Sequence, residues 1–374
     1  MRIRTVVLAG ALAAAVHSSA AAATPSVDAR AYEVVNAATG EVLGARNARA
    51  RLPMASITKL MTVLVTLERA KLGDVVTVDR DAVGVTGSGV HLRAGEQITV
   101  RDLIAAALIQ SANDAAIALA AHVGRGDEDA FVALMNRKAQ QLGLSSTHFE
   151  RADGLDVAGH VSTAHDLNRL AQVAMREPAI RDIVGVRNTT IAGGRPLHTW
   201  NDLLGSFPGL IGVKTGHTGD AGWCQVAAAR GPGFTIYATI LGSPTRTERN
   251  ADLAELLAFG LSSYRLVPVI STARTYATAE LPYGRDPLRL VAMKPVLRPV
   301  RLARSLTERV VAPTAVALPV REGQRLGEVH VYDRGKLVAS SPLVAARSVE
   351  LPGTASKVGW YAKRTLHHLG GLFS

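Results

Sequence analysis

The chain has 374 residues, of which 48% are hydrophobic and 20% charged, and its formal net charge is +11. Residues 24–266 carry 24 side chains of each sign, whereas residues 267–374 carry 16 basic and 7 acidic ones. A nucleic-acid-binding protein usually spreads its basic residues over its main domain or gathers them in a disordered tail, so this distribution argues against nucleic acid as a partner and favours a terminal module that faces an anionic surface.

Residues 1–23 have the pattern of a secretory signal. Arg2 and Arg4 make a basic start, Val6–Val16 is apolar but too short to cross a bilayer, and small residues lead to a cleavage site after Ala23. The pattern predicts an exported protein, in the periplasm or at the outer face of the cytoplasmic membrane. An uncleaved anchor or a buried helix is the alternative interpretation of the same residues.

Residues 24–266 have the patterning of an α+β domain. A β-rich run at 31–38, a turn and a second run at 41–45 predict a hairpin at its start. Helical spacing of apolar residues then dominates, and strands return near the end, so the order is not an alternating βαβ one. The expected helices are 53–70, 102–122, 129–142, 163–176 with Thr163 as N-cap, and 250–264; the later strands are 210–213, 225–229 and 235–241.

The sequence changes in character after Tyr264. Residues 267–355 consist of short Val/Leu runs punctuated by prolines, which predicts a small all-β domain with strands at 310–320 and 328–338 and a turn at 333–336.

Residues 356–374 return to helical spacing and predict an amphipathic helix that lies in a membrane interface. A helix docked on its own domain is the alternative. The apolar arc comprises Val358, Tyr361, Ala362, Leu366, Leu369, Leu372 and Phe373, and the basic arc comprises Lys357, Lys363, Arg364 and His367.

Ser56 and Lys59 are the first candidate catalytic pair. At the start of a helix, residues three apart lie on one face, so the lysine amine can reach the serine hydroxyl. A serine hydroxyl becomes a good nucleophile when a base takes its proton, and burial among cations can turn a lysine into that base. The pattern S-x-x-K is common by chance, and an N-cap serine beside a solvated lysine fits it equally well.

Two further segments supply polar groups. Ser111 and Asn113 follow an apolar run at 103–109, where a break in the helix would let both side chains enter one cleft. Lys214, Thr215 and Gly216 follow the strand 210–213, and the backbone N–H of His217 can point at an oxyanion. Each segment is weak evidence alone, and it is their order and separation in one chain that make a strong signal.

Together these motifs resemble the low-molecular-mass penicillin-binding proteins that are serine D-alanyl-D-alanine carboxypeptidases (S11-like peptidases). The second motif is S-A-N rather than S-D-N, which points away from β-lactamases. The resemblance covers residues 30–265 closely and implies the penicillin-recognising serine transferase fold, a five-stranded antiparallel sheet with helices on both faces. Further runs agree with it: Leu142-Gly143-Leu144, Thr147-His148-Phe149, Asp153-Gly154-Leu155-Asp156 and Leu241-Gly242.

The resemblance implies roles for the acyl transfer itself. Ser56 would be the acylated nucleophile and Lys59 its general base. Ser111 would pass the proton to the leaving D-Ala amine, and Asn113 would orient the acyl part of the substrate. The backbone N–H groups of Ser56 and His217 would form the oxyanion hole.

It also implies how the substrate carboxylate is held. Lys214 would keep Lys59 neutral and attract the carboxylate, while Thr215 and Arg249 would bind it. Gly216 leaves room for the substrate along the strand edge. Asp153 and Asp156 are expected to cap turns or to support a loop over the site.

The function that these roles imply is removal of the terminal D-Ala from peptidoglycan pentapeptide, with trapping by β-lactams. A D,D-endopeptidase that cuts crosslinks is the nearest alternative. A β-lactamase would need a carboxylate in an E-x-x-L-N stretch, which neither Glu150 nor Glu177 begins. A non-catalytic wall- or membrane-binding protein is an alternative of another class.

We expect no metal and no cofactor. His, Asp and Glu do not recur at metal-ligand spacing, and none of the glycine clusters forms a phosphate loop. The single cysteine, Cys224, excludes an internal disulfide framework and a thiolate zinc site, and we expect it to pack as a small apolar residue.

Overall fold

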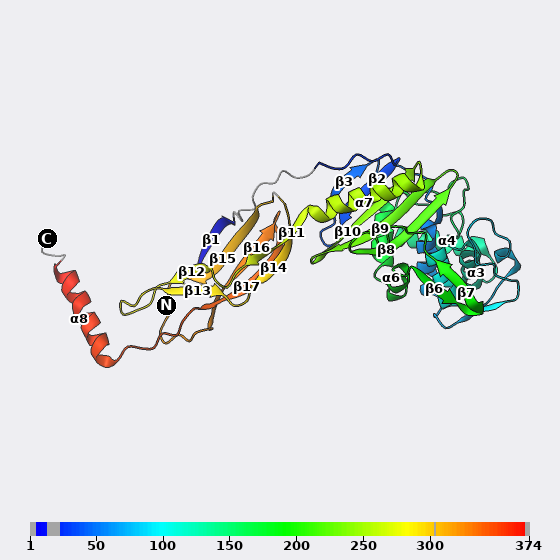
Figure 1. Cartoon of the computed structure of the whole chain (residues 1–374). Helices are drawn as coiled ribbons and strands as arrows, with labels where there is room; N and C mark the ends of the chain where they lie inside the picture. The colour runs from blue at the N-terminus through cyan, green and yellow to red at the C-terminus, as the bar shows by residue number, and fades with distance from the viewer. Residues whose placement is uncertain (1–4, 13–22, 303, 371–374) are drawn as a thin grey trace. The chain divides into compact units, whose positions relative to one another are not determined.

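The structure is a computed structural model that describes residues 5–12, 23–302 and 304–370 (Figure 1). Of these residues, 23–263 belong to one unit, and 5–12 together with 264–370 belong to a second. The first unit contains every residue that the sequence predicts for the site.

The first unit is built on a five-stranded antiparallel sheet, as the sequence resemblance implies. Its strand order is β3 (Glu41–Arg46), β2 (Ala31–Asn36), β10 (Phe234–Ser243), β9 (Gly222–Gly231) and β8 (Leu210–Thr218). The predicted end of the strand at 213 is wrong, because β8 continues through 218. Its second half carries polar residues that are buried at the site, so a search for apolar runs stops too early.

Helices cover both faces of this sheet (Figure 1). Helix α7 (Arg246–Ser262) brings Gly260 against Ile236, and α5 (Ala164–Ala174) brings Asn168 into a hydrogen bond with Thr239. Ile236 and Thr239 are an odd number of residues apart on one strand, so they point to opposite faces. The predicted start of the last helix at 250 is four residues late, because the Thr245 hydroxyl caps the helix by accepting from the N–H of Glu248.

The helix predicted over 102–122 is interrupted. Helix α2 (Val100–Ala105) passes into a π-helical turn, η3 (Ala106–Gln110), and stops at Ser111, whose φ of 62° is left-handed. Helix α3 (Asn113–Gly124) then begins afresh. The break falls at Ser111, and both Ser111 and Asn113 are buried beside it.

The remaining helices follow the predictions more closely. The segment 53–70 begins as a 3₁₀ turn, η1 (Ala55–Thr58), and continues as α1 (Lys59–Leu67). Helix α4 (Glu128–Gln141) corresponds to the predicted 129–142. Thr163 is confirmed as the N-cap of α5, because its hydroxyl accepts from the N–H of Asp166 at 3.0 Å.

Several short elements have no counterpart among the predictions because they are too short to show a period. They are β4 (Val75–Thr77), η2 (Arg80–Ala82), β5 (Gln97–Thr99), α6 (Pro178–Val184), β6 (Asn188–Ile191), η4 (Ala192–Gly194) and β7 (Arg195–His198).

The second unit is mostly β-structure. A six-stranded sheet has the order β1 (Thr5–Leu12), β15 (Leu306–Pro313), β16 (Arg325–Asp333), β17 (Lys336–Ala345), β13 (Leu288–Ala292) and β12 (Thr275–Ala279). A ribbon of β11 (Tyr264–Ile270) and β14 (Val296–Arg301) and the helix α8 (Thr354–Gly370) complete it. The strand predicted over 310–320 ends at Pro313, whereas the turn at 333–336 is present, with Asp333 opposite Lys336.

Two predicted features, the export signal and the terminal helix, lie partly outside the residues that the structure describes. Strand β1 takes up part of the predicted export signal, and most of that segment's other residues lie outside the described ones. Leu372 and Phe373 of the predicted terminal helix also lie outside them. Among the described residues, we find no helix with the length and apolar content needed to cross a membrane.

Candidate active site

Ser56 lies in the 3₁₀ turn η1, next to Gly216 of strand β8. Ala55, the residue before it, has a left-handed φ of 50°, a strained conformation for a residue with a Cβ. Thr58 stabilises this turn by donating from its hydroxyl to the carbonyl of Ala55 at 2.8 Å. His160 in turn contacts the Thr58 hydroxyl through Nε2 at 2.7 Å. The turn that presents Ser56 is therefore supported from the protein interior.

Lys59 is fully buried and donates three hydrogen bonds from Nζ. The acceptors are Ser56 Oγ at 2.8 Å, Asn113 Oδ1 at 2.7 Å and the backbone carbonyl of Asp153 at 2.6 Å. Burial lowers the pKa of Lys59 to about 7, against opposing effects of the Asp153 and Asp114 carboxylates. A lysine whose pKa lies near neutral pH can be present as the free amine, and the free amine can accept the Ser56 proton.

Ser111 is joined to Lys214 across the site. Lys214 Nζ donates to Ser111 Oγ at 2.8 Å and to the backbone carbonyl of Thr215 at 2.8 Å. Burial lowers the pKa of Lys214 well below its usual value, and the positive charges of Lys59 and Arg249 lower it further. The charge of Lys59 therefore opposes protonation of Lys214.

Asn113 is engaged at both ends of its side-chain amide. Its oxygen accepts from Lys59, and its nitrogen donates to the carbonyl of Thr86 at 2.7 Å. These partners fix which way the amide faces. An amide nitrogen carries two hydrogens, so one remains for a substrate carbonyl.

Strand β8 runs close to the Ser56 turn because Gly216 has no side chain. A Cβ at this position would lie 2.9 Å from the Ala55 Cβ and 3.0 Å from the backbone nitrogen of Ser56. Any other residue would push the strand away from Ser56. The next side chain, His217, stacks on Trp223 with ring centroids 4.0 Å apart, so its ring packs against β9.

Arg249 projects from the first turn of α7 and is 1% exposed. Its guanidinium lies 5.5 Å from the ring centroid of Trp223, and its Nη2 donates to Asp202 Oδ2 at 3.1 Å. Burial lowers the pKa of Arg249 to about 10, so it stays protonated at neutral pH. It is a fixed positive charge suited to a carboxylate.

These elements enclose one cavity of about 260 Å³. Seven of the nine predicted site residues line it, and Lys59 and Lys214 reach it through their bonds to Ser56 and Ser111. Those lining it are Ser56, Ser111, Asn113, Thr215, Gly216, His217 and Arg249.

Residues 18–245 match the model of a protein family described as D-alanyl-D-alanine carboxypeptidase. The chain belongs to this family. As a member it is a hydrolase, a serine D-alanyl-D-alanine carboxypeptidase of the penicillin-binding type.

Relatives of this carboxypeptidase match it over most of their length. The D-alanyl-D-alanine carboxypeptidase DacF of Bacillus subtilis is 30% identical over 352 residues, which cover 91% of this chain and 89% of the relative. DacC of Escherichia coli is 32% identical over 372 residues, which cover 94% of this chain and 92% of the relative.

Solved structures resemble it as well. Penicillin binding protein 5 from Haemophilus influenzae has a TM-score of 0.65 at 26% identity, covering 88% of this chain and all of that one. The Streptomyces K15 DD-transpeptidase has a TM-score of 0.61 at 31% identity, covering 64% of this chain and all of that one.

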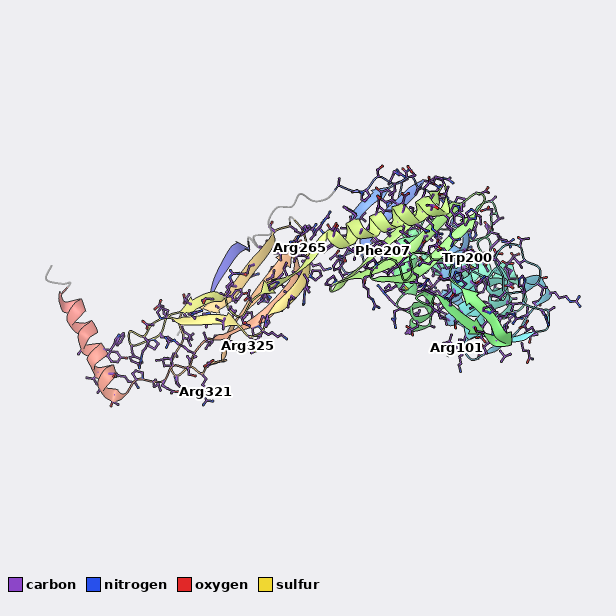
Figure 2. All side chains as sticks on the ribbon, in the orientation of Figure 1. Arg101, Trp200, Phe207, Arg265, Arg321 and Arg325 are labelled. Carbon is purple, nitrogen blue, oxygen red and sulfur yellow. The ribbon has the colours of Figure 1, made fainter. Side chains whose placement is uncertain are left out.

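The sequence missed several residues of this carboxypeptidase's cavity. Trp200 lies on the connection between β7 and β8 and is 39% exposed (Figure 2). Its Nε1 donates to the carbonyl of Gln110 at 2.9 Å, and Arg246 packs over its ring. Trp223 and Leu155 line the cavity too. Trp200 is an isolated aromatic in a loop and carries no sequence pattern, so only the fold could reveal it.

A larger cavity, of about 650 Å³, lies against β15 and β16 in the second unit. It is lined mainly by apolar residues and by none of the motif residues, so it is separate from the serine site. Across residues 5–12, 23–302 and 304–370, no group of three or more His, Cys, Asp or Glu side chains is arranged to hold a metal.

Proposed function

We propose that Ser56 is the nucleophile of this carboxypeptidase and Lys59 its general base. The observation that carries the proposal is the 2.8 Å contact between Lys59 Nζ and Ser56 Oγ, made by a buried lysine whose pKa is about 7. Neutral Lys59 takes the hydroxyl proton as Ser56 Oγ bonds to the carbonyl carbon of the substrate. The backbone N–H groups of Ser56 and His217 stabilise the oxyanion, and the nearness of Gly216 to Ser56 supports this pairing.

Collapse of that intermediate requires a proton on the leaving amine. Ser111, bonded to Lys214, passes to the amine the proton that Lys59 took from Ser56, so the C–N bond breaks and free D-Ala leaves while Ser56 stays acylated. Water then attacks the acyl carbon, Lys59 takes a proton from it, and that proton goes to Ser56 Oγ as the ester C–O bond breaks, which frees Ser56 and the shortened peptide. Asn113 orients the acyl part, and its remaining N–H supports this role.

The substrate we propose is peptidoglycan pentapeptide that ends in D-Ala-D-Ala. Its terminal carboxylate binds Thr215 and Arg249, with Lys214 adding positive potential. A β-lactam resembles the same dipeptide end and acylates Ser56 without a ready leaving group. The proposed inhibitors are therefore β-lactams.

Intact-mass measurement after addition of penicillin tests the nucleophile. We expect an adduct of one penicillin on the wild-type protein and none on Ser56→Ala. No adduct on either protein, or equal adducts on both, would contradict the assignment. Product analysis on isolated peptidoglycan, scoring free D-Ala against cut crosslinks, separates the carboxypeptidase from a D,D-endopeptidase.

We also propose that the chain is exported and held at a membrane by its C-terminus. Residues 1–23 are the signal, 24–266 the peptidase domain, 267–355 the small all-β domain and 356–374 an amphipathic helix. Cleavage after Ala23 would remove β1 and leave β15 at the edge of its sheet. Exposure of Val358 (68%) and Tyr361 (56%), with the basic excess of residues 267–374, supports contact with an anionic membrane.

A further inference from the structure

The partly exposed Arg151 and the buried Asp153 form an ion pair that the proposed mechanism does not use, and the backbone carbonyl of Asp153 contacts Lys59. We propose that the pair of Arg151 and Asp153 is the positioning element of Lys59: it fixes the backbone carbonyl that orients the amine, and its two charges act on that amine in opposite directions. The inference rests on the proposed role of Lys59 as base.

The pair holds its stretch of backbone firmly. Arg151 Nε donates to Asp153 Oδ1 at 2.9 Å and Nη2 to Oδ2 at 2.8 Å, and the Asp153 side chain is fully buried. The N–H of Leu155 donates to the same carboxylate at 3.1 Å. Gly154, with a φ of 87°, packs so closely that a Cβ there would lie 2.3 Å from the carbonyl of Ala55. The Asp153 carbonyl therefore has little freedom to move.

That carbonyl decides where the lone pair of Lys59 points. A neutral amine has two N–H bonds and one lone pair. The Asp153 carbonyl and Asn113 Oδ1 lie 2.6 Å and 2.7 Å from Nζ and can accept both N–H bonds. The lone pair then faces Ser56 Oγ at 2.8 Å, as proton transfer requires. Without the carbonyl, the amine can rotate and present an N–H to Ser56 instead.

The charges around Lys59 come from three elements. The loop 151–155 brings Arg151 and Asp153, α3 brings Asp114, and β8 brings Lys214. Besides burial, the carboxylates of Asp153 and Asp114 raise the pKa of Lys59, and Arg151 lowers it. The two residues of this ion pair therefore change the pKa of Lys59 in opposite directions, although both help to fix the Asp153 backbone carbonyl.

The test uses this opposition. We would measure the single-turnover rate of acylation by a fluorescent penicillin against pH, on full-length mature protein, for wild type, Asp153→Asn, Arg151→Gln and the double variant. Loss of positioning should lower the maximal rate about 10- to 100-fold in each. The acid limb is the part of the pH–rate profile where the rate rises as Lys59 loses its proton. It should move to lower pH in Asp153→Asn, which removes a charge that raises the pKa of Lys59, and to higher pH in Arg151→Gln, which removes one that lowers it. In the double variant it should lie between the two.

A matched control pair lies in the second unit. Glu308 is a buried carboxylate that Arg274 binds through two hydrogen bonds from a partly exposed position, as Arg151 binds Asp153. Glu308→Gln and Arg274→Gln should leave both the rate and the limb unchanged. If Asp153→Asn does not fold, Arg151→Gln still tests the inference, because Arg151 is partly exposed.

The outcomes separate this inference from the proposed function. A maximal rate that stays at the wild-type value in both single variants overturns the positioning role. Limbs that stay at the wild-type pH, or that move in the same direction in both single variants, overturn the opposed action of the two charges. Both outcomes leave Lys59 as base. A wild-type protein that forms no adduct on Ser56, or whose acylation rate shows no acid limb, overturns the proposed function itself.

Discussion

Lys214 and Ser111 are 103 residues apart in sequence, and their side chains are joined by a 2.8 Å hydrogen bond at the floor of the cavity. The bond links strand β8 of the sheet to the break between η3 and α3. In the proposed mechanism this bond holds the hydroxyl that delivers a proton to the leaving amine. The site therefore has two lysine–serine pairs, Lys59 with Ser56 and Lys214 with Ser111.

The second pair is tested by Ser111→Ala. Removing the hydroxyl deprives the leaving amine of its donor and leaves Lys214 with only the Thr215 carbonyl as acceptor. We expect kcat/KM for a D-Ala-D-Ala peptide to fall about 100-fold or more. Ser262→Ala, near the end of α7, is the control and should behave as wild type. Normal peptide turnover by Ser111→Ala would rule out the relay.

The anchoring of Arg249 is tested by Asp202→Asn. The Asp202 carboxylate accepts from Arg249, Arg246 and Asn250, so its loss should let the Arg249 guanidinium move. We expect KM for a peptide with a free C-terminal carboxylate to rise about fivefold, or about 1 kcal/mol, with kcat nearly unchanged.

A substrate with a C-terminal amide in place of the carboxylate shows whether the effect of Asp202→Asn on KM depends on the substrate's negative charge. Its KM should not respond to Asp202→Asn, since it offers no carboxylate to Arg249. Glu248→Gln, in the same turn of α7, should not change KM for either substrate. Equal effects of Asp202→Asn on both substrates would mean that Asp202 acts on the fold instead.

Stability in acid is tested at His160. Its Nδ1 accepts from the N–H of Glu150 at 3.0 Å, so neutral His160 must carry its proton on Nε2 and donate to Thr58. Burial lowers the pKa of His160 from 6.5 to about 4. Above pH 6.5 the His160 ring is neutral in both the folded and the unfolded chain. Between pH 6.5 and about 4 the unfolded chain binds it and the folded chain resists it, so stability falls by up to about 3 kcal/mol.

His160→Gln removes this titration and keeps a donor for Thr58. The free energy of unfolding, measured by urea denaturation, should therefore fall less steeply with acid in the variant than in wild type. His122→Gln, at the end of α3, controls for the loss of a histidine and should keep the wild-type slope. An unchanged slope in His160→Gln would show that His160 is not the group that titrates.

The membrane helix is tested by deleting residues 357–374. The truncated protein should lose binding to anionic vesicles and keep its activity on a soluble peptide, because none of the described side chains of α8 lines the cavity. Changing Val358 and Tyr361 to Ser retains the charge and removes exposed apolar surface, and should weaken vesicle binding about tenfold or more. Undiminished binding after the truncation would refute the anchor.

Local spacing explains why part of the site could be predicted. Ser56 and Lys59 are one helical turn apart, so their contact follows from backbone geometry alone. Ser111 and Lys214 could be paired only through the family resemblance, because nothing in their local sequence connects them. The break at Ser111 was expected, but its left-handed φ and the π-helical turn before it depend on packing of the surrounding helices.

Asp153 shows what the sequence could not decide. In the sequence it is an acidic residue before a glycine, and turn capping is the natural expectation. In the structure its carboxylate is buried against Arg151 and its carbonyl accepts from Lys59, the proposed general base. Asp202 and Trp223 are similar cases, since each acquires a role by lying beside Arg249, a residue distant in the chain.

The sequence by itself determined the chemistry of this carboxypeptidase: which residue types it uses, in what order, and that its basic excess lies in the last third of the chain. Those features are local or compositional, so they need no fold to be recognised. Only the tertiary structure decided the lowered pKa of Lys59, the proposed base, and the anchoring of Arg249, the arginine proposed to bind the carboxylate. Both depend on burial and on charges brought together from distant segments, and desolvation exists only once the chain has folded around those groups.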